Sequence, residues 1–237
     1  MKKGVLYLIP STLGGESTSD IIPEDVKNSA IQLRHFIVED LKSARRYLRK
    51  LDRTFPIDDC TFHILNKSTD PAVVASYLRV AANGENIGLM SDAGCPGVAD
   101  PGAVAVGIAH KKGIRVQPFV GPSSILLALM GSGFSGQQFT FHGYLPKDRK
   151  DRIRTLKRYE SDTRQTGYTH LFMDTPFRNM NVLDDLLNEL SDATLLCIAC
   201  NISHPDESIR TLSIKDWREN AYDLAKKPTI FAIGTMQ

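Results

Sequence analysis

One loop of the sequence combines the residue types that can hold a charged ligand. Residues 91–102 read Ser-Asp-Ala-Gly-Cys-Pro-Gly-Val-Ala-Asp-Pro-Gly and directly follow an apolar run, 87–90. Glycines let a ligand approach the backbone, and the Asp92 carboxylate can accept hydrogen bonds from a ribose or an ammonium group. The alternative is a tight strand-to-helix connection that Gly and Pro merely stiffen.

A second loop, Gly121-Pro122-Ser123-Ser124, also lies between an expected strand and an expected helix. Ser123 or Ser124 can cap that helix, and the free amides at its start can hold a carboxylate or a phosphate. Capping alone explains the two serines equally well.

Gly131, Gly133 and Gly136 form a literal Gly-x-Gly-x-x-Gly. A dinucleotide fingerprint needs a strand before it and a helix after it. Here a helical run, 125–130, comes before and a strand, 139–144, comes after. We therefore interpret the glycines as a linker between domains and predict no nicotinamide or flavin cofactor.

Two pairs of possible metal ligands, Cys60 with His63 and Cys197 with Cys200, have a spacing found in zinc sites, and His204 follows the second pair. Both pairs lie in extended apolar runs, where positions i and i+3 point to opposite faces. We predict no metal site and buried, unpaired thiols.

The elements that position these loops alternate between strands and helices. The first half predicts strands over 4–9, 35–39, 61–65, 87–90 and 114–120, with helices between them. This order predicts a mostly parallel sheet covered by helices on both faces. Ligands bind such sheets beyond the carboxyl ends of the strands, where the first two loops lie.

Beyond residue 121 the pattern changes, which predicts two α/β domains, 1–120 and 121–237. A polar turn joins strands 195–200 and 208–212 into an antiparallel hairpin, so the second sheet is expected to be mixed. A helix capped at Thr175 and another over 214–225 complete the unit.

Composition excludes disorder and indicates a soluble globular protein: 237 residues, 42% hydrophobic, with a net charge of +2. No apolar run approaches the roughly 18 residues of a membrane span. The N-terminal apolar stretch has no cleavage pattern, and four cysteines do not make a disulfide framework. We expect a cytoplasmic protein.

Two segments carry most of the local positive charge. Residues 34–53 hold seven Lys or Arg against three acids, and residues 147–164 hold eight against four. If both faced one cleft they would attract a polyanion such as RNA. The alternative is two solvated helix faces.

The sequence resembles the tetrapyrrole methylase superfamily of S-adenosylmethionine-dependent methyltransferases, most of all its bacterial branch that methylates the ribose 2′-hydroxyl of 16S rRNA. The resemblance spans nearly the whole chain and is most specific over 84–146. It rests on residues 6–10, Glu39-Asp40, 91–96, 100–102, 121–123, 143–146 and 172–178.

The resemblance implies a two-domain α/β fold, usually a homodimer, with S-adenosylmethionine in the cleft between the domains. The residues that match its cofactor pocket are Pro10, Asp92, Ala93, Cys95, Ser123 and Ser124, and more loosely Met173, Ala199 and Thr229. Glu39, Asp40 and Arg178 match positions that handle the methyl acceptor, although a structural or surface role explains all three as well.

Positions that would face the substrate depart from the rRNA branch. Residues 11–16, Leu41-Lys42 and 200–204 replace its Thr-Pro-x-Gly-Asn, Thr-Arg and Arg-Glu-Leu-Thr-Lys motifs. The cofactor loops do match, and together with the two basic segments they make an RNA ribose methyltransferase the leading hypothesis, with the small ribosomal subunit as substrate. A methyltransferase for a small tetrapyrrole or precorrin is the alternative, and a non-catalytic RNA-binding protein is the third.

Overall fold

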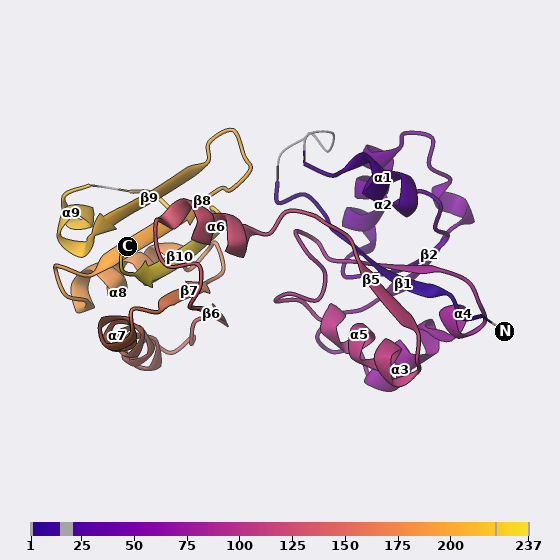
Figure 1. Ribbon diagram of the computed structural model, residues 1–237. Coiled ribbons are helices and arrows are strands. Elements are labelled where there is room, and N and C mark those ends of the chain that lie inside the picture. Colours follow the sequence, from indigo (N-terminus) through magenta and orange to yellow (C-terminus); the bar gives the residue numbers. More distant parts are fainter. Residues whose placement is uncertain (1, 15–20, 221, 237) are drawn as a thin grey trace. The chain divides into compact units, whose positions relative to one another are not determined.

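The computed structural model describes residues 2–14, 21–220 and 222–236. The chain divides into two compact units, Met1–Ser123 and Ser124–Gln237, and each combines a sheet with helices (Figure 1). Among the described residues no helix is both long and apolar enough to span a membrane.

The described part of the first unit contains a five-stranded sheet in the order β3-β2-β4-β1-β5, in which all pairs are parallel. Its inner strand β4 is buried at every position, as expected for a sheet that is covered on both faces. The strands are β1 (Val5–Ile9), β2 (His35–Val38), β3 (Thr61–Ile64), β4 (Ile87–Met90) and β5 (Arg115–Pro118).

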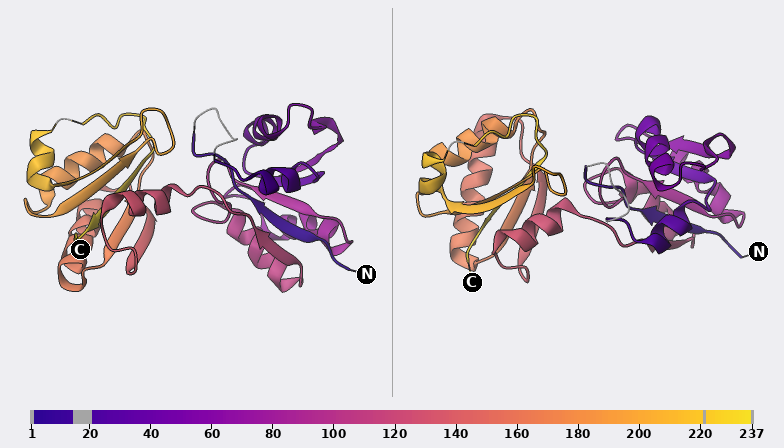
Figure 2. Two further views of the ribbon diagram at one scale, coloured as in Figure 1. Left: turned by 45° about the horizontal axis from the view of Figure 1, so that its top comes forward. Right: turned by 90° about the horizontal axis from the view of Figure 1, so that it is seen from above.

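Helices cover both faces of this sheet (Figure 2). One face packs into a core with α1 (Glu24–Ala30), α2 (Leu41–Leu51) and the short 3-10 turn η1 (Ile57–Asp59). The other face packs against α3 (Pro71–Tyr77), α4 (Arg79–Ala82) and α5 (Gly102–Lys111). The predicted α/β architecture of this half is confirmed.

The second unit holds a five-stranded sheet over its described residues, in the order β6-β7-β10-β8-β9. Only the β6–β7 pair is parallel, so the predicted mixed sheet is confirmed. The strands are β6 (Phe139–Tyr144), β7 (Thr169–Met173), β8 (Leu195–Cys200), β9 (Ser208–Ser213) and β10 (Thr229–Gly234).

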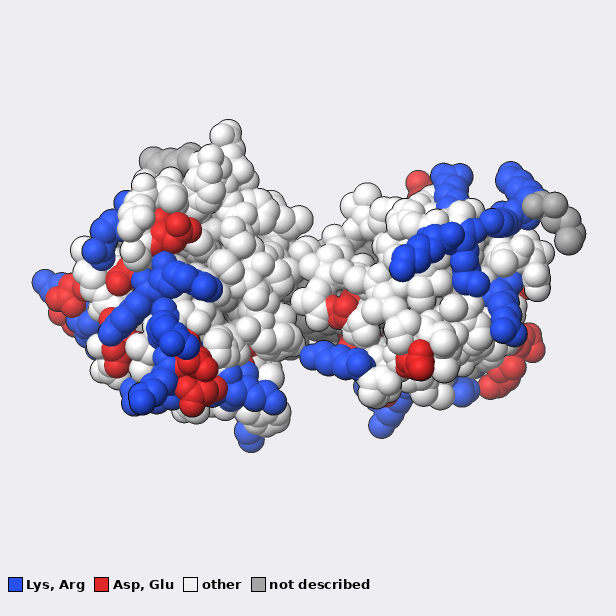
Figure 3. Space-filling view, turned by 90° about the horizontal axis from the view of Figure 1, so that it is seen from below, with Lys and Arg blue, Asp and Glu red and all other residues white. Residues whose placement is uncertain are grey.

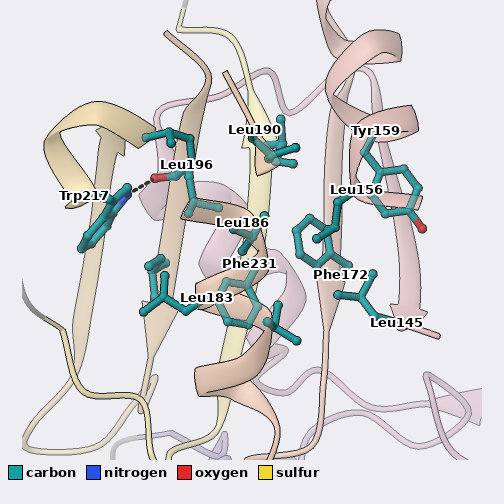
Figure 4. Close-up of a cluster of buried hydrophobic side chains, with 14 of the residues drawn as sticks. Leu145, Leu156, Tyr159, Phe172, Leu183, Leu186, Leu190, Leu196, Trp217 and Phe231 are labelled. Carbon is teal, nitrogen blue, oxygen red and sulfur yellow. Dashed lines mark hydrogen bonds between the residues drawn. The ribbon is translucent and has the colours of Figure 1, made fainter. Parts of the chain in front are cut away.

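Alternate residues of these strands face two different sets of helices. Phe172 and Phe231 stack on one face, in a core with α7 (Arg149–Thr166), α8 (Asn179–Glu189) and α9 (Ile214–Glu219) (Figure 4). The buried Trp217 indole of α9 donates a 2.9 Å hydrogen bond to the Leu196 carbonyl. Helix α6 (Ser124–Ser132) packs against β8, β9 and β10, and Thr211 of β9 donates a 2.7 Å hydrogen bond to the Ser132 carbonyl.

Three local predictions differ from the structure. The glycines 131–136 lie inside the second unit and therefore do not link the units. Gly131 lies within α6, and the neighbouring Phe134 packs against Gly234. Helix α8 begins at Asn179 instead of after Thr175, because the Arg178 N–H closes a separate turn on the Thr175 carbonyl and the Pro176 carbonyl accepts the Lys226 N–H. Helix α9 ends at Glu219, well before residue 225.

Candidate functional site

The predicted loops meet at the carboxyl edge of the first sheet. Strands β1 and β4 are neighbours there, but their chains leave toward opposite faces: β1 leads to α1 and β4 leads to α5. Such a divergence opens the edge of a parallel sheet to ligands. Pro10 follows β1, Glu39 follows β2, and Ser91-Asp92 follow β4.

Backbone hydrogen bonds lock the loop after β1 to the loop after β4. Ser11 N–H donates to the Gly94 carbonyl at 2.9 Å, and Gly94 N–H returns the bond to the Ser11 carbonyl at 3.1 Å. The Ser11 hydroxyl, which is buried, also donates to the Ser91 carbonyl at 2.9 Å. Gly94 has φ +71°, a conformation that favours glycine at this bend.

The segment after β5 closes on the same two loops. A Cβ placed on Gly121 would lie 2.1 Å from the Cβ of Pro10, so the two residues pack backbone against ring. The Cys95 thiol lies 3.3 Å from the Pro122 carbonyl and donates to it. The structure therefore gathers Pro10, Cys95 and the segment that ends at Ser123, and places the exposed Asp92 and Ala93 on the same loop as Cys95.

Helix α2 is fastened to this cluster by one buried side chain. The Tyr47 hydroxyl donates a 2.7 Å hydrogen bond to the Pro10 carbonyl, and burial raises the Tyr47 pKa well above its ordinary value. The start of α2 is fixed as well, because the Asp40 carboxylate caps it by accepting the Ser43 N–H at 2.8 Å.

Carboxylates accumulate at this edge and raise one another's pKa values. Burial raises the pKa of Glu39, and the charge of Asp92 raises it further. Burial and the charge of Asp40 raise the pKa of Asp92. Hydrogen bonds from Ser43, by contrast, hold the pKa of Asp40 below its usual value. The combined field favours a cationic ligand over an anionic one.

Asp100 gives the glycine-rich loop its shape. Its carboxylate accepts the Gly97 N–H at 2.9 Å and the Gly102 N–H at 2.6 Å, where α5 begins. Burial raises the pKa of Asp100, whereas these hydrogen bonds act in the opposite direction. Glu39 and Asp100 share a cavity of about 10 Å³, which admits at most one water molecule. A larger ligand therefore has to lie on the open side of the loops.

In the second unit, the three loosely matched residues share the edge where β7 ends and β10 begins. Met173 and Ala199 both pair with Ile230, so Met173, Ile230 and Ala199 form one row across β7, β10 and β8. Thr229 precedes Ile230 and therefore lies on the opposite face of the sheet.

Arg178 lies at the N-cap of α8, in an ion pair with the buried Asp174. It belongs to the second unit, whereas Glu39 and Asp40 are adjacent in the first. The structure thus brings two of the three expected acceptor-handling residues together within one unit.

Within the described ranges no group of three or more His, Cys, Asp or Glu side chains is arranged to hold a metal ion. Cys60, Cys95, Cys197 and Cys200 are all free thiols. Burial raises the pKa of Cys197 to about 11, which disfavours the thiolate that a metal requires.

Two contributors to the site were not assigned from the sequence: Tyr47 and Asp100. Asp100 had a local signal, because an Asp side chain in a turn commonly accepts the backbone N–H two residues further on. Tyr47 had none beyond its place on the apolar face of α2, since its partner Pro10 lies 37 residues away.

Comparisons with known proteins agree with this architecture. No family model matches the chain. A ribosomal RNA small subunit methyltransferase I from Halalkalibacterium halodurans is 32% identical over 189 residues, which cover 78% of this chain and 60% of that protein. The protein of the same name from Escherichia coli O157:H7 is 26% identical over 219 residues, covering 87% of this chain and 68% of that protein.

Two solved structures share the fold across nearly the whole chain. The methyltransferase CobJ superposes with a TM-score of 0.63 at 17% identity, covering 98% of this chain and 94% of CobJ. Uroporphyrin III C-methyltransferase from Thermus thermophilus gives a TM-score of 0.57 at 14% identity, with 98% of both chains covered. The parallel sheet with its gathered loops, followed by a mixed sheet, is thus the fold that these two methyltransferases share. The curated relatives that the chain matches are named small-subunit ribosomal RNA methyltransferases, and the chain spans about 60% of the length of the first of them.

Proposed function

We propose that this protein is an S-adenosylmethionine-dependent methyltransferase that acts on a ribose 2′-hydroxyl of small-subunit ribosomal RNA. The observation that carries the proposal is the interlocked edge of the first sheet, where three loops meet beside a group of carboxylates at the point where β1 and β4 diverge. The names of the relatives support the choice of acceptor.

The residues present fit this cofactor chemically. S-adenosylmethionine is a sulfonium cation with an already activated methyl group, so the protein's task is mainly to position the reactants. Gly97 has a positive φ, and a Cβ there would meet only the Ala103 nitrogen at 3.9 Å, so the loop after β4 is open to close approach at this point. The exposed Asp92 can accept hydrogen bonds from a ribose or an ammonium group, and the surrounding carboxylates favour positive charge.

Pro10, Ala93, Cys95, Ser123 and Ser124 are proposed to complete the binding surface next to Asp92. In the second unit we propose that Met173, Ala199 and Thr229 contribute as well. Met173 and Ala199 share one face at one edge of the sheet, which supports their part, while Thr229 lies at the same edge on the other face.

Glu39 is better suited than Asp40 to draw the proton from an acceptor hydroxyl. A general base works best when its pKa lies near the working pH, and the pKa of Glu39 is raised whereas that of Asp40 is lowered. The Asp40 carboxylate is also engaged in capping α2. Arg178, held by Asp174, is proposed to bind an acceptor oxygen.

The cofactor claim is tested by titrating S-adenosylmethionine into the wild type and into Asp92→Asn, with binding followed by calorimetry. We expect Asp92→Asn to weaken binding about tenfold or more, because a charged hydrogen-bond acceptor is worth roughly 1.5–3 kcal/mol. Asp184→Asn, an exposed Asp on α8, is the matched control and should bind normally. Equal affinities for all three proteins would show that Asp92 is not at the site, and no binding by the wild type would refute the proposed enzyme.

The acceptor claim is tested by methyl transfer from labelled cofactor to unmodified small ribosomal subunits, to total RNA and to a tetrapyrrole. Label in the small-subunit RNA at a ribose, located by nuclease mapping, is expected. Label only in the tetrapyrrole would replace the RNA proposal with the small-molecule alternative.

The resemblance also supports a homodimer that works in the cytoplasm. Size-exclusion chromatography with light scattering checks the first point: a mass near twice the 26.3 kDa of the chain is expected, and a monomeric mass would contradict it.

A further inference from the structure

The two basic segments differ in how their charges are compensated. Both contain an amphipathic helix, α2 or α7, and the cations of these helices are exposed except for the buried Arg152 of α7. A cation that already contacts a carboxylate adds little to the affinity for a phosphate. Either its ion pair with the carboxylate must break, or the carboxylate stays close and repels the phosphate. The number of uncompensated cations therefore decides which helix can bind a polyanion.

Helix α7, every residue of which the structure describes, has most of its positive charge engaged in ion pairs. Five of its seven Lys and Arg residues lie within 4 Å of a carboxylate, and Figure 3 shows acidic side chains interspersed among the basic ones on this unit. The pairs are Arg149–Asp185 at 2.9 Å, Arg152–Asp185 at 2.6 Å, Arg154–Asp151 at 2.5 Å, Lys157–Glu189 at 2.8 Å and Arg164–Glu160 at 3.9 Å.

Helix α2 has fewer close ion pairs: Lys42 and Arg49 act on the Asp40 and Asp52 carboxylates through their charge, with no ion pair within 4 Å among the described residues. The eleven residues of α2 include no acid, and its exposed side carries Lys42, Arg45, Arg46, Arg49 and Lys50. Arg45 pairs with Asp58, which is itself 89% exposed, and Arg49 donates to the Arg53 carbonyl, which carries no formal charge. Arg46 has neither a hydrogen bond nor an ion pair with any residue that the structure describes.

Three of these cations form a continuous stripe. Lys42, Arg46 and Arg49 follow at i, i+4 and i+7, which places them on one helix face over a length of about 10 Å. At about 3.4 Å per nucleotide, this length matches roughly three phosphates of a strand.

The stripe begins at the candidate site. Helix α2 starts directly after Glu39 and Asp40, and the Tyr47 hydroxyl fixes the helix to Pro10. A strand that lies along the stripe is therefore led to the carboxylates at the end of β2.

We infer that the exposed face of α2, through Lys42, Arg46 and Arg49, is the surface on which the sugar–phosphate backbone of the RNA docks, and that α7 is not. This inference rests on the proposed RNA substrate and adds where that substrate binds within the first unit. We choose RNA as the ligand of this surface because of charge complementarity. A row of cations, in which Arg46 has no carboxylate partner among the described residues, matches a regular polyanion.

The experiment compares two triple variants with equal loss of charge. One replaces Lys42, Arg46 and Arg49 by Gln, and the other replaces the paired Arg154, Lys157 and Arg164 by Gln. Lys, Arg and Gln have similar helix propensities, so both helices should persist, which circular dichroism checks. Binding to in vitro transcribed small-subunit ribosomal RNA is measured by filter binding over a range of salt concentrations, and binding of S-adenosylmethionine is measured in parallel.

For the α2 variant we expect RNA binding at least about tenfold weaker and a salt slope, log Kd against log salt, reduced by about 2, since each phosphate contact contributes about 0.7. The α7 variant should change affinity by less than about threefold, and both should bind S-adenosylmethionine normally.

Equal losses in the two variants, or a loss confined to the α7 variant, would overturn the docking surface while the proposed function stands. No RNA binding by the wild type at low salt would overturn both. Binding to phosphatidylglycerol vesicles that needs the α2 cations, while RNA binding does not, would assign the surface to a membrane instead.

Discussion

Gly121 occupies a point of the first unit where the backbone leaves no room for a side chain. The Cβ of any other residue would lie 2.1 Å from the Cβ and 2.4 Å from the Cγ of Pro10. The proline ring cannot move aside as a flexible side-chain end could, and the Pro10 carbonyl is also held by Tyr47. One glycine thus allows the loops after β1 and β5 to touch.

Gly121→Ala is predicted to lower the free energy of unfolding by about 1–3 kcal/mol, as expected for overpacking of a close contact. It should also weaken S-adenosylmethionine binding, because Pro10 and the loop that carries it must shift. Chemical denaturation and calorimetry measure the two effects.

The matched control is Gly107→Ala in α5, where a Cβ would meet nothing within 4 Å. This variant should be neutral or more stable by up to about 1 kcal/mol, since Ala is favoured over Gly inside a helix. If Gly121→Ala behaved like this control, the contact with Pro10 would not be tight in solution.

At the level of elements, a chain of polar rings joins α7 to β6 and β7. His142 Nε2 of β6 lies 2.8 Å from His170 Nδ1 of β7, and His170 Nε2 lies 2.8 Å from the Asp162 carboxylate of α7. Tyr159 of α7 stacks on His142 and on His170, while Arg158 adds a nearby positive charge. Burial and the neighbouring His170 lower the pKa of His142 to about 4, and burial lowers that of His170 despite Asp162.

This pair predicts a loss of stability in mild acid. Because the pKa of His142 is lower in the folded state than the ordinary 6.5, the unfolded state binds more protons between pH 6.5 and about 4. His142 therefore costs no unfolding free energy above pH 6.5, where it is neutral in both states. As the pH falls through this window, the unfolded state takes up the proton first and the free energy of unfolding declines. After allowance for solvent contact, a loss of about 2 kcal/mol is expected.

His142→Gln should make the unfolding free energy less dependent on pH over that window, as measured by urea denaturation at several pH values. His110→Gln, an exposed His of α5, should retain the full dependence of the wild type. Indistinguishable pH profiles for the wild type and His142→Gln would rule out the His pair as the acid-sensitive contact.

At the level of the whole molecule, the buried residues form separate cores in the two units. Two clusters lie on the faces of the first sheet, and a third, which includes Trp217, Phe172 and Phe231, lies in the second unit. Each unit has more than 100 residues, a length at which a single core is sufficient for stable folding.

Fragments 1–123 and 124–237 are therefore predicted to fold separately. Each should show a cooperative thermal transition, and their far-ultraviolet circular dichroism spectra should add up to that of the full chain. A non-cooperative transition in either fragment would show that its core depends on the rest of the chain.

Much of the fold follows from the sequence because its signals are local. Alternating apolar patterns and their bounding turn residues predict β6 with its observed bounds, 139–144, and the parallel sheet of the first unit follows from the β/α order. Local signals failed where a tertiary contact competed with them. Thr175-Pro176 has the form of a helix start, but the Pro176 carbonyl accepts the distant Lys226 N–H at 3.1 Å, and α8 begins at Asn179.

The sequence by itself determined which residue types gather at the carboxyl ends of the strands, because in a parallel sheet those ends share one edge. Only the tertiary structure decided that Tyr47 reaches Pro10, that Gly121 packs on the same residue, and that Asp185 neutralises Arg149 and Arg152, more than 30 residues away. The net charges of the two basic segments are equal, so they did not distinguish α2 from α7 as a surface for RNA. The partners of their cations depend on which distant segments the fold brings alongside each helix, and no local pattern encodes that.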